Sequence, residues 1–270
     1  MKKLLLSSIL FGIGTTTFAL SDYKNFQQFD NQVSFGINYQ NGNFNNSQAN
    51  GNPHGYSITA LNLEVERLFD IGLWGLFDAS VAQTYTQTIT DNSNIPTQPV
   101  GSYPFLQTMN AKIGYNFPLL NSLSVTPYIQ LGKNADLTSY TTFSGLNIIG
   151  SGNSGSNVTN DFYYTYGGGL RMEYIINKYV NVYLDQMVAQ NSDQTGYGFN
   201  NYIISTSNTQ WTTTLGGKIN PWQKLQLGAN LLYTNYNNYD QKSVTTLNSL
   251  GVAVPSTAFG FQMSAGFTFE

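Results

Sequence analysis

Residues able to do acid–base or nucleophilic chemistry are few in this sequence, which contains one histidine, His54, and no cysteine. Histidine can act as a general base near neutral pH, and a carboxylate and a hydroxyl beside it would complete an acyl-transfer site. Asp91 and Ser93 are the residues that could join His54 in such an acyltransferase-like site. A protease-like site would instead need paired carboxylates. The candidates for that pair are Asp161, Asp193 and Asp240.

These residue types are common in polar segments, so we expect no catalytic residue among them and expect the protein not to be an enzyme. One histidine and no cysteine supply too few nitrogen or sulfur ligands for zinc, so neither a metal nor a cofactor is expected. The glycines of YGGGLRMEYI (166–175) could suggest a phosphate-binding loop, but such a loop must lead into a helix. The residues after these glycines alternate as in a strand, so we do not expect nucleotide binding.

Charged side chains are a further set of candidate functional residues. Eight of them lie at the centres of alternating apolar and polar segments. Each has the parity opposite to the apolar residues around it, so all eight would point to one face of a sheet. Five are acidic and three are basic, a mixture that can form internal salt bridges. We therefore predict a charge network inside the lumen of a barrel. Its members are Glu64, Glu66, Asp78, Lys112, Arg171, Glu173, Asp185 and Lys218.

The alternation that positions these residues recurs in ten segments, and short connections alternate with long polar ones between them. This arrangement is typical of an all-β, closed antiparallel transmembrane up-and-down β-barrel. We predict about ten strands, with eight or twelve as alternatives. The expected strand cores are 33–39, 61–66, 77–81, 109–115, 123–131, 164–174, 180–184, 211–219, 225–233 and 261–269.

Lipid is the solvent that suits the apolar face of these strands. Only 9% of the residues are charged, and the mean hydropathy of −0.22 is too polar for a bundle of membrane-spanning helices. The apolar face is also too large to fill one barrel interior, so we expect it to face lipid while the polar face lines a closed or narrow lumen. Aromatic residues of the apolar parity would form two girdles. They are Tyr39, Tyr85, Tyr115, Tyr174, Trp211, Tyr233, Phe267 and Phe269.

The first 19 residues have the layout of a secretory signal: two lysines, an apolar run and small residues before a cleavage point after Ala19. The expected organisation is a signal peptide at 1–19 and a barrel at 20–270. Cleavage would leave nine basic and 14 acidic residues, a net charge of −5, which argues against a nucleic-acid partner. The expected location is the outer membrane of a Gram-negative-type bacterium.

The mature chain resembles the small outer-membrane β-barrel proteins of such bacteria, the OmpA-type and porin-like superfamily. The resemblance rests on LSVTPYIQLG (123–132), on YGGGLRMEY (166–174) and on the terminal strand Gln262–Phe269. It implies that the barrel-assembly machinery recognises the terminal strand, although Ser264 stands where that signal often has Gly and Glu270 follows its final Phe. We expect outer-membrane lipid as a partner and a monomeric protein; a surface ligand is not identified.

Two functions follow for such a barrel. One is a structural or adhesive surface protein, or a narrow porin-like channel, because the long segments between strands are rich in Asn, Gly, Ser and Tyr. The alternative is an outer-membrane enzyme of acyltransferase or protease type that uses His54, since enzymes of this superfamily use a histidine.

Overall fold

The computed structural model of the chain describes most of the residues after position 20. The described ranges are 21–45, 53–89, 98–99, 105–135, 139–140, 162–193, 197–199, 202–204, 207–222, 224–238 and 252–269. The expected signal peptide, 1–19, lies outside them, as do Asp91, Ser93, Asp161 and Asp240 of the catalytic hypotheses.

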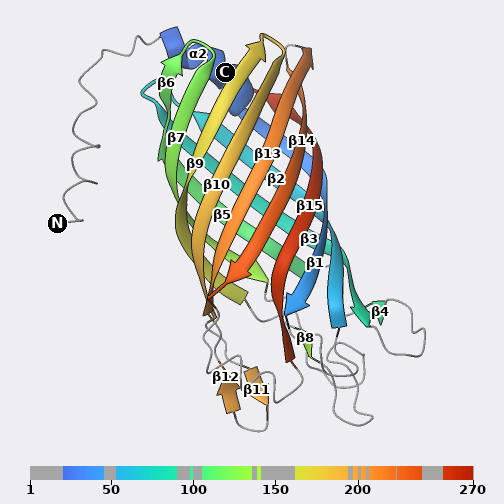
Figure 1. Cartoon of the computed structure of the whole chain (residues 1–270). Coiled ribbons are helices and arrows are strands. Elements are labelled where there is room, and N and C mark those ends of the chain that lie inside the picture. The colour runs from blue at the N-terminus through green and yellow to red at the C-terminus, as the bar shows by residue number, and fades with distance from the viewer. Residues whose placement is uncertain are drawn as a thin grey trace, which may run out of the picture.

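Ten long antiparallel strands form a closed barrel (Figure 1). They are β1 (Gln32–Asn45), β2 (Pro53–Leu68), β3 (Leu73–Ile89), β5 (Phe105–Tyr115), β7 (Leu123–Ala135), β9 (Phe162–Asn177), β10 (Val180–Asp193), β13 (Ser207–Trp222), β14 (Leu225–Asn237) and β15 (Val252–Thr268). Each pairs with the next in this order, and β1 pairs with β15 from Gln32 opposite Thr268 to Asn45 opposite Val254. The predicted barrel class and strand number are confirmed.

One helix and five short strands complete the described elements. They are α2 (Ser21–Asp30), β4 (Gln98–Pro99), β6 (Phe117–Leu120), β8 (Ser139–Tyr140), β11 (Tyr197–Phe199) and β12 (Tyr202–Ile204). Helix α2 and β6 lie at one end of the barrel, together with the short turns, whereas β4, β8, β11 and β12 lie at the opposite end (Figure 1). We call these the short-turn end and the far end. Within the described ranges, the helix is neither long nor apolar enough to cross a membrane.

The alternation of the sequence places apolar side chains outside and polar ones inside. In β1, Phe35 is 63% exposed and Ile37 57%, whereas the intervening side of the strand buries Ser34 at 2%. The same outward exposure recurs around the barrel. Examples are Leu61, Val81, Ile113, Ile129, Leu131, Leu215, Leu231 and Met263. A closed sheet with an apolar outer face satisfies its backbone groups internally and needs hydrocarbon around it.

A β-bulge in β3 corrects one prediction. Thr59 of β2 pairs with Thr84, but the next residue, Ala60, pairs with Ala82, so β3 carries one extra residue at this point. An extra residue reverses the side to which the following side chains point. Tyr85, predicted to face lipid in an aromatic girdle, is therefore turned into the barrel and is only 1% exposed.

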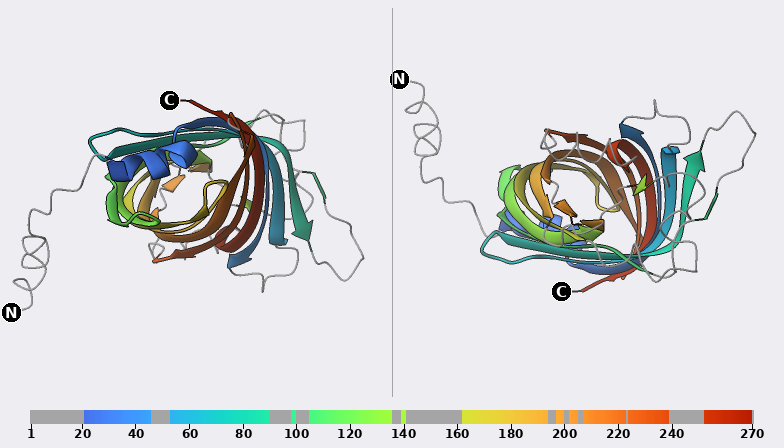
Figure 2. Two further views of the ribbon diagram at one scale, coloured as in Figure 1. Left: turned by 90° about the horizontal axis from the view of Figure 1, so that it is seen from above. Right: turned by 90° about the horizontal axis from the view of Figure 1, so that it is seen from below.

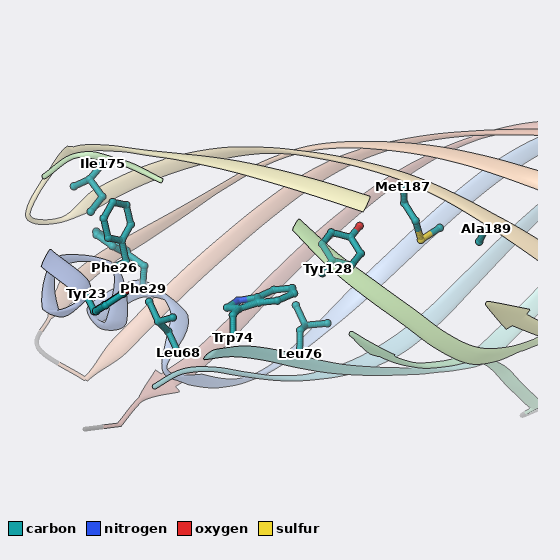
Figure 3. Close-up of a cluster of buried hydrophobic side chains, with 10 residues drawn as sticks. All are labelled: Tyr23, Phe26, Phe29, Leu68, Trp74, Leu76, Tyr128, Ile175, Met187 and Ala189. Atoms are coloured by element: carbon teal, nitrogen blue, oxygen red, sulfur yellow. The ribbon is translucent and has the colours of Figure 1, made fainter. Parts of the chain in front are cut away.

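Two apolar clusters occupy the barrel interior. The first runs from α2 along the lumen and contains Trp74 and Tyr128, with ring centroids 5.7 Å apart (Figure 3). The second gathers Phe44, Tyr56 and Tyr85 nearer the far end, with ring centroids of Tyr56 and Phe44 5.1 Å apart. The lumen of the short-turn half is thus filled by side chains rather than lined only by polar groups.

Candidate functional site

Helix α2 lies across the short-turn mouth of the barrel (Figure 2). Its aromatic residues Tyr23, Phe26 and Phe29 recur every third position, which places them on one face of a helix. All three are buried, Phe26 and Phe29 completely, and they pack with Leu68 and Ile175 of the barrel wall (Figure 3). The burial of this face, rather than the propensity of a ten-residue helix, accounts for its stability.

Hydrogen bonds attach α2 to several strands around the mouth. The Gln27 side chain donates to the Leu68 carbonyl at 3.2 Å and to Oδ1 of Asp70 at 2.8 Å, both at the β2–β3 end. Across the mouth, Asn220 of β13 donates to the Gln28 carbonyl at 2.8 Å, and Gln226 of β14 donates to the Phe29 carbonyl at 3.0 Å. The last two bonds use carbonyls of the helix C-terminus, which have no partner within the helix. The helix is therefore held by its backbone as well as by its aromatic face.

A buried charge cluster joins α2 to the barrel wall. Arg171 of β9 places Nη1 2.8 Å from Oε1 of Glu66 and Nη2 3.5 Å from Oδ1 of Asp30. Lys218 of β13 forms ion pairs with the same two carboxylates, at 3.3 Å to Asp30 and in a short contact with Glu66. Glu173 lies 3.9 Å from Arg171. All five side chains are almost fully buried, and buried charges persist only where they are paired and hydrogen-bonded.

Two aromatic side chains complete this charge cluster. The Trp74 indole donates to Oε1 of Glu66 at 2.9 Å, and the Arg171 guanidinium lies 4.1 Å from the centroid of the Tyr183 ring. A guanidinium over an aromatic face gains a cation–π attraction, which is larger away from water. These contacts fix the position of the Arg171 side chain beside α2, which we call the plug helix.

Asp30 is the member of the charge cluster that lies outside the membrane-spanning strands. Burial raises the pKa of its carboxyl well above the usual value, and the nearby Glu173 and Glu66 carboxylates add to this effect against Lys218 and Arg171. The cluster contains three acids and two bases, so it carries a net charge of −1 when every member is ionised. A proton on Asp30 would make it neutral. Within the described residues, Oδ2 of Asp30 has no hydrogen-bond partner, which leaves an oxygen for that proton.

A second polar group lies farther from α2. Lys112 pairs with Asp185 at 3.0 Å, Tyr128 donates a short hydrogen bond to the same carboxylate, and Asn110 donates to Asp78 at 3.1 Å. A cavity of about 170 Å³ adjoins these residues, and amide and hydroxyl side chains from Asn, Gln and Thr form most of its lining. This cavity lies inside the barrel and is lined mainly by polar side chains, as expected for a lumen that holds water.

Seven of the eight charged residues singled out from the sequence thus form two groups inside the barrel, and the eighth, Glu64, adjoins the first group. Glu66, Arg171, Glu173 and Lys218 belong to the charge cluster, and Asp78, Lys112 and Asp185 to the second group. Glu64 accepts a hydrogen bond at 3.0 Å from Gln32, which also donates to Glu66 and so stands beside the cluster.

The remaining girdle residues are placed as follows. Tyr115, Tyr174 and Phe267 are exposed near the short-turn end, Trp211 and Tyr233 are exposed towards the far end, and Tyr39 is exposed in the middle of β1. Phe269 follows β15, is half-buried, and lies 5.7 Å from the Arg67 guanidinium. Tyr85 does not belong to this outer set.

Sequence reasoning missed α2 and with it Asp30. The signal was present: Tyr23, Phe26 and Phe29 have helical spacing, and Asp30 follows directly. The segment is short and adjoins the expected cleavage point, so its spacing alone does not say which surface it covers. Trp74 and Tyr183 have the polar parity, and their roles beside Glu66 and Arg171 follow only from the closed barrel.

Of the hypothetical catalytic residues, His54 and Asp193 are those whose backbone the structure describes. His54 belongs to β2 and Asp193 to β10, and these strands are not neighbours in the barrel. The side chains of both residues lie outside the described part of the structure. Within the described residues, no group of three or more His, Cys, Asp or Glu side chains is arranged to hold a metal ion.

Charged groups paired inside a closed sheet, with apolar side chains all around its outer face, require hydrocarbon outside and a polar environment inside. The protein is a transmembrane β-barrel. No protein-family model matches its sequence, and a search of curated proteins finds no relative.

Solved structures similar to this transmembrane β-barrel are outer-membrane proteins. The β domain of the Bordetella autotransporter BrkA shares 13% identity at a TM-score of 0.47, covering 89% of this chain and 100% of that one. The attachment invasion locus protein Ail of Yersinia pestis shares 12% sequence identity at a TM-score of 0.33, and the match covers 89% of this chain and 99% of that one. The outer membrane protease OmpT of Escherichia coli shares 7% sequence identity at a TM-score of 0.40, and the match covers 89% of this chain and 97% of that one. All three TM-scores are below 0.5 and all three identities are below 25%.

Proposed function

We propose that this barrel resides in the outer membrane of a Gram-negative-type bacterium, is exported through a cleaved signal peptide, and acts as a structural or adhesive surface protein with a plugged lumen. Cleavage after Ala19 would leave a mature chain that starts one residue before α2. The helix would then be the first element of the mature protein and would fill the periplasmic mouth. The long polar segments would extend from the opposite, external end.

The observation that carries the proposal of a plugged lumen is the complete burial of Phe26 and Phe29, on the helix whose last residue, Asp30, contacts Arg171. Apolar rings, ion pairs and backbone hydrogen bonds together make α2 part of the barrel core. A ten-stranded barrel is also small enough for side chains to fill its interior. Diffusion of solutes through an open pore is therefore not the activity that we propose.

The adhesive role rests on the composition of the long polar segments between the strands. These segments combine Asn, Gly and Ser, which make adaptable hydrogen bonds, with Tyr, which offers a flat aromatic contact surface. Such a composition suits recognition of a surface ligand, whose identity the composition does not specify.

We also propose that the protein is not an enzyme. The buried carboxylates in the lumen are already engaged by Arg171, Lys218 and Lys112, so they are poorly placed to activate water for an incoming substrate.

Single-channel recording in planar bilayers tests the plugged lumen. The wild-type protein should give little steady conductance, whereas the double variant Phe26→Ser/Phe29→Ser should open more often because both rings leave the mouth. Lys24→Ala, an exposed change on the same helix, is the matched control and should behave as wild type. Large, stable steps from the wild-type protein would refute the plugged lumen, as would identical traces from wild type and the double variant.

A further inference from the structure

The short-turn end of the barrel carries most of the exposed positive charge in the described part of the chain. Lys24, Arg67, Lys178 and Lys224 are exposed at this end. Lys112, Arg171 and Lys218 are instead enclosed in the lumen. Near the far end, the described residues include one basic side chain, Lys133 of β7.

Two of these cations share one groove. The groove has a volume of about 760 Å³ and lies between Gln28 of α2, the β9–β10 turn, the β13–β14 turn and the end of β15. Lys178 and Lys224 line it together with Tyr179 and Trp222, and none of its described lining residues is acidic. Strands β10 and β13, which adjoin these turns, are hydrogen-bonded neighbours in the barrel and lie side by side in Figure 1.

Backbone hydrogen bonds hold the walls of the groove in place. The Asn220 amide donates to the Tyr179 carbonyl at 2.8 Å, which ties the two turns to each other. The Thr268 amide donates to the Lys224 carbonyl at 3.1 Å, which ties the second turn to the end of β15. The groove is therefore formed by the ordered ends of strands, and its two lysines project from positions fixed by the barrel.

The groove lies at the level where the apolar outer face ends. Ile176 of β9, Val182 of β10 and Ile219 of β13 are exposed on that face, and Tyr179 and Trp222 follow them towards the short-turn end, at 49% and 68% exposed. Tyr and Trp at the end of an apolar belt mark the membrane–water interface. Lysines at this level reach the headgroup region, where anionic lipids attract basic side chains.

We propose that this groove binds the headgroup of an anionic phospholipid in the inner leaflet of the outer membrane. Lys178 and Lys224 contact the phosphate, while Tyr179 and Trp222 pack against the glycerol and upper acyl region. The position of the groove at the edge of the lipid-facing surface favours a lipid over a soluble anion, since the acyl chains can continue along the apolar outer face. This site depends on the membrane placement proposed above, and its test measures lipid binding rather than conductance.

Native mass spectrometry of the purified full chain in detergent micelles, titrated with phosphatidylglycerol or phosphatidylcholine, tests the site. The wild type should bind phosphatidylglycerol more tightly than phosphatidylcholine. Because one lysine near an anionic surface contributes about 1 kcal/mol, Lys178→Ala or Lys224→Ala should weaken that binding about fivefold, and the double variant about 25-fold. Binding of phosphatidylcholine should change little.

Lys133→Ala is the matched control. Lys133 also lies beside a tyrosine, with Nζ 5.3 Å from the centroid of the Tyr164 ring, as Lys178 lies 4.8 Å from that of Tyr179. Its loss should leave phosphatidylglycerol binding unchanged. Equal binding of the two lipids by the wild type, or an equal loss in Lys133→Ala and Lys178→Ala, would overturn the proposal. Displacement of phosphatidylglycerol by millimolar inorganic phosphate would also overturn it, because the groove would then be a site for a soluble anion. None of these results would bear on the conductance test.

Discussion

Oδ1 of Asp30, the last residue of α2, lies 3.5 Å from Nη2 of Arg171, which projects into the lumen from β9. The same guanidinium is 2.8 Å from Glu66 of β2. Arg171 therefore links the plug helix to strands on different parts of the wall. Since both partners are buried, this contact couples the seating of α2 to the closure of the barrel.

Removing the guanidinium should destabilise the barrel strongly. Arg171→Met keeps a long side chain but leaves three buried acids, Asp30, Glu66 and Glu173, with Lys218 as the one remaining base of the cluster. Loss of one partner of a buried ion pair typically costs about 3–5 kcal/mol, and we expect a loss of that size in the free energy of unfolding. Urea unfolding in detergent micelles, followed by tryptophan fluorescence, measures it.

The control for this change is Arg67→Met. Arg67 is exposed and stacks on Phe69, with the guanidinium carbon 4.8 Å from the ring centroid, so its loss should cost far less. Equal losses in the two variants would contradict a structural role for the charge cluster.

Asp30 should make the stability of the protein depend on pH. Its pKa is raised in the folded protein, so the folded state holds a proton that the unfolded chain releases above about pH 3.9. The contribution of Asp30 to stability is then fully present below that pH and is lost as pH rises through the folded pKa.

Asp30→Asn mimics the protonated side chain and should remove this part of the pH dependence. Unfolding free energies measured from acid to mildly alkaline pH should fall less steeply in the variant than in wild type. Parallel curves for the two proteins would show that Asp30 does not hold the proton of the cluster.

Gly169 should tolerate no larger side chain, because a Cβ there would contact the hydroxyl and ring of Tyr128 inside the lumen. Gly169→Val forces Tyr128 to move, although its hydroxyl is bonded to Asp185. Overpacking of this kind usually costs about 1–3 kcal/mol of unfolding free energy. Gly75→Val in β3 is the comparison, since a Cβ there would lie 3.9 Å from the Lys112 carbonyl oxygen, an ordinary van der Waals contact. Unfolding of both variants at the same urea concentration would contradict the requirement for glycine beside Tyr128.

His54→Ala separates the surface-protein proposal from the enzymatic alternative. Cells that produce the variant should have the same lipid A acylation and the same outer-membrane proteolysis as cells that produce the wild type. Asn116→Ala, which removes a buried side chain bonded to Ser124 and Thr126 at 3.0 Å, serves as a control for effects of reduced protein level. A loss of acylation or proteolysis in His54→Ala at normal protein level would favour the enzyme.

The barrel could be predicted from sequence because its two solvents impose a period of two on every strand. In β1, Phe35 and Ile37 face outward and Ser34 faces inward. In β9, Leu170 faces outward and Arg171 inward for the same reason. Tyr85 shows the limit of this reasoning. One extra residue in β3 reverses the parity beyond it, and the sequence carries no mark of that bulge.

The charged positions in the lumen could be predicted, but their grouping could not. Parity alone places Glu66 and Lys112 on the same face, whereas the barrel closure determines that Glu66 meets Arg171 and Lys218 and that Lys112 meets Asp185. The contribution of Asp30 depends on α2 folding back into the mouth, a tertiary contact between segments far apart in the chain.

Thiol labelling provides the most direct test of the plug, because the chain has no cysteine of its own. In Phe29→Cys the new thiol should lie at a position that is fully buried against the barrel, whereas in Lys24→Cys it should be exposed on the same helix. A water-soluble maleimide should label Lys24→Cys rapidly in folded protein and leave Phe29→Cys unlabelled until urea is added. Equally rapid labelling of both variants in folded barrels would contradict the seating of α2 in the mouth.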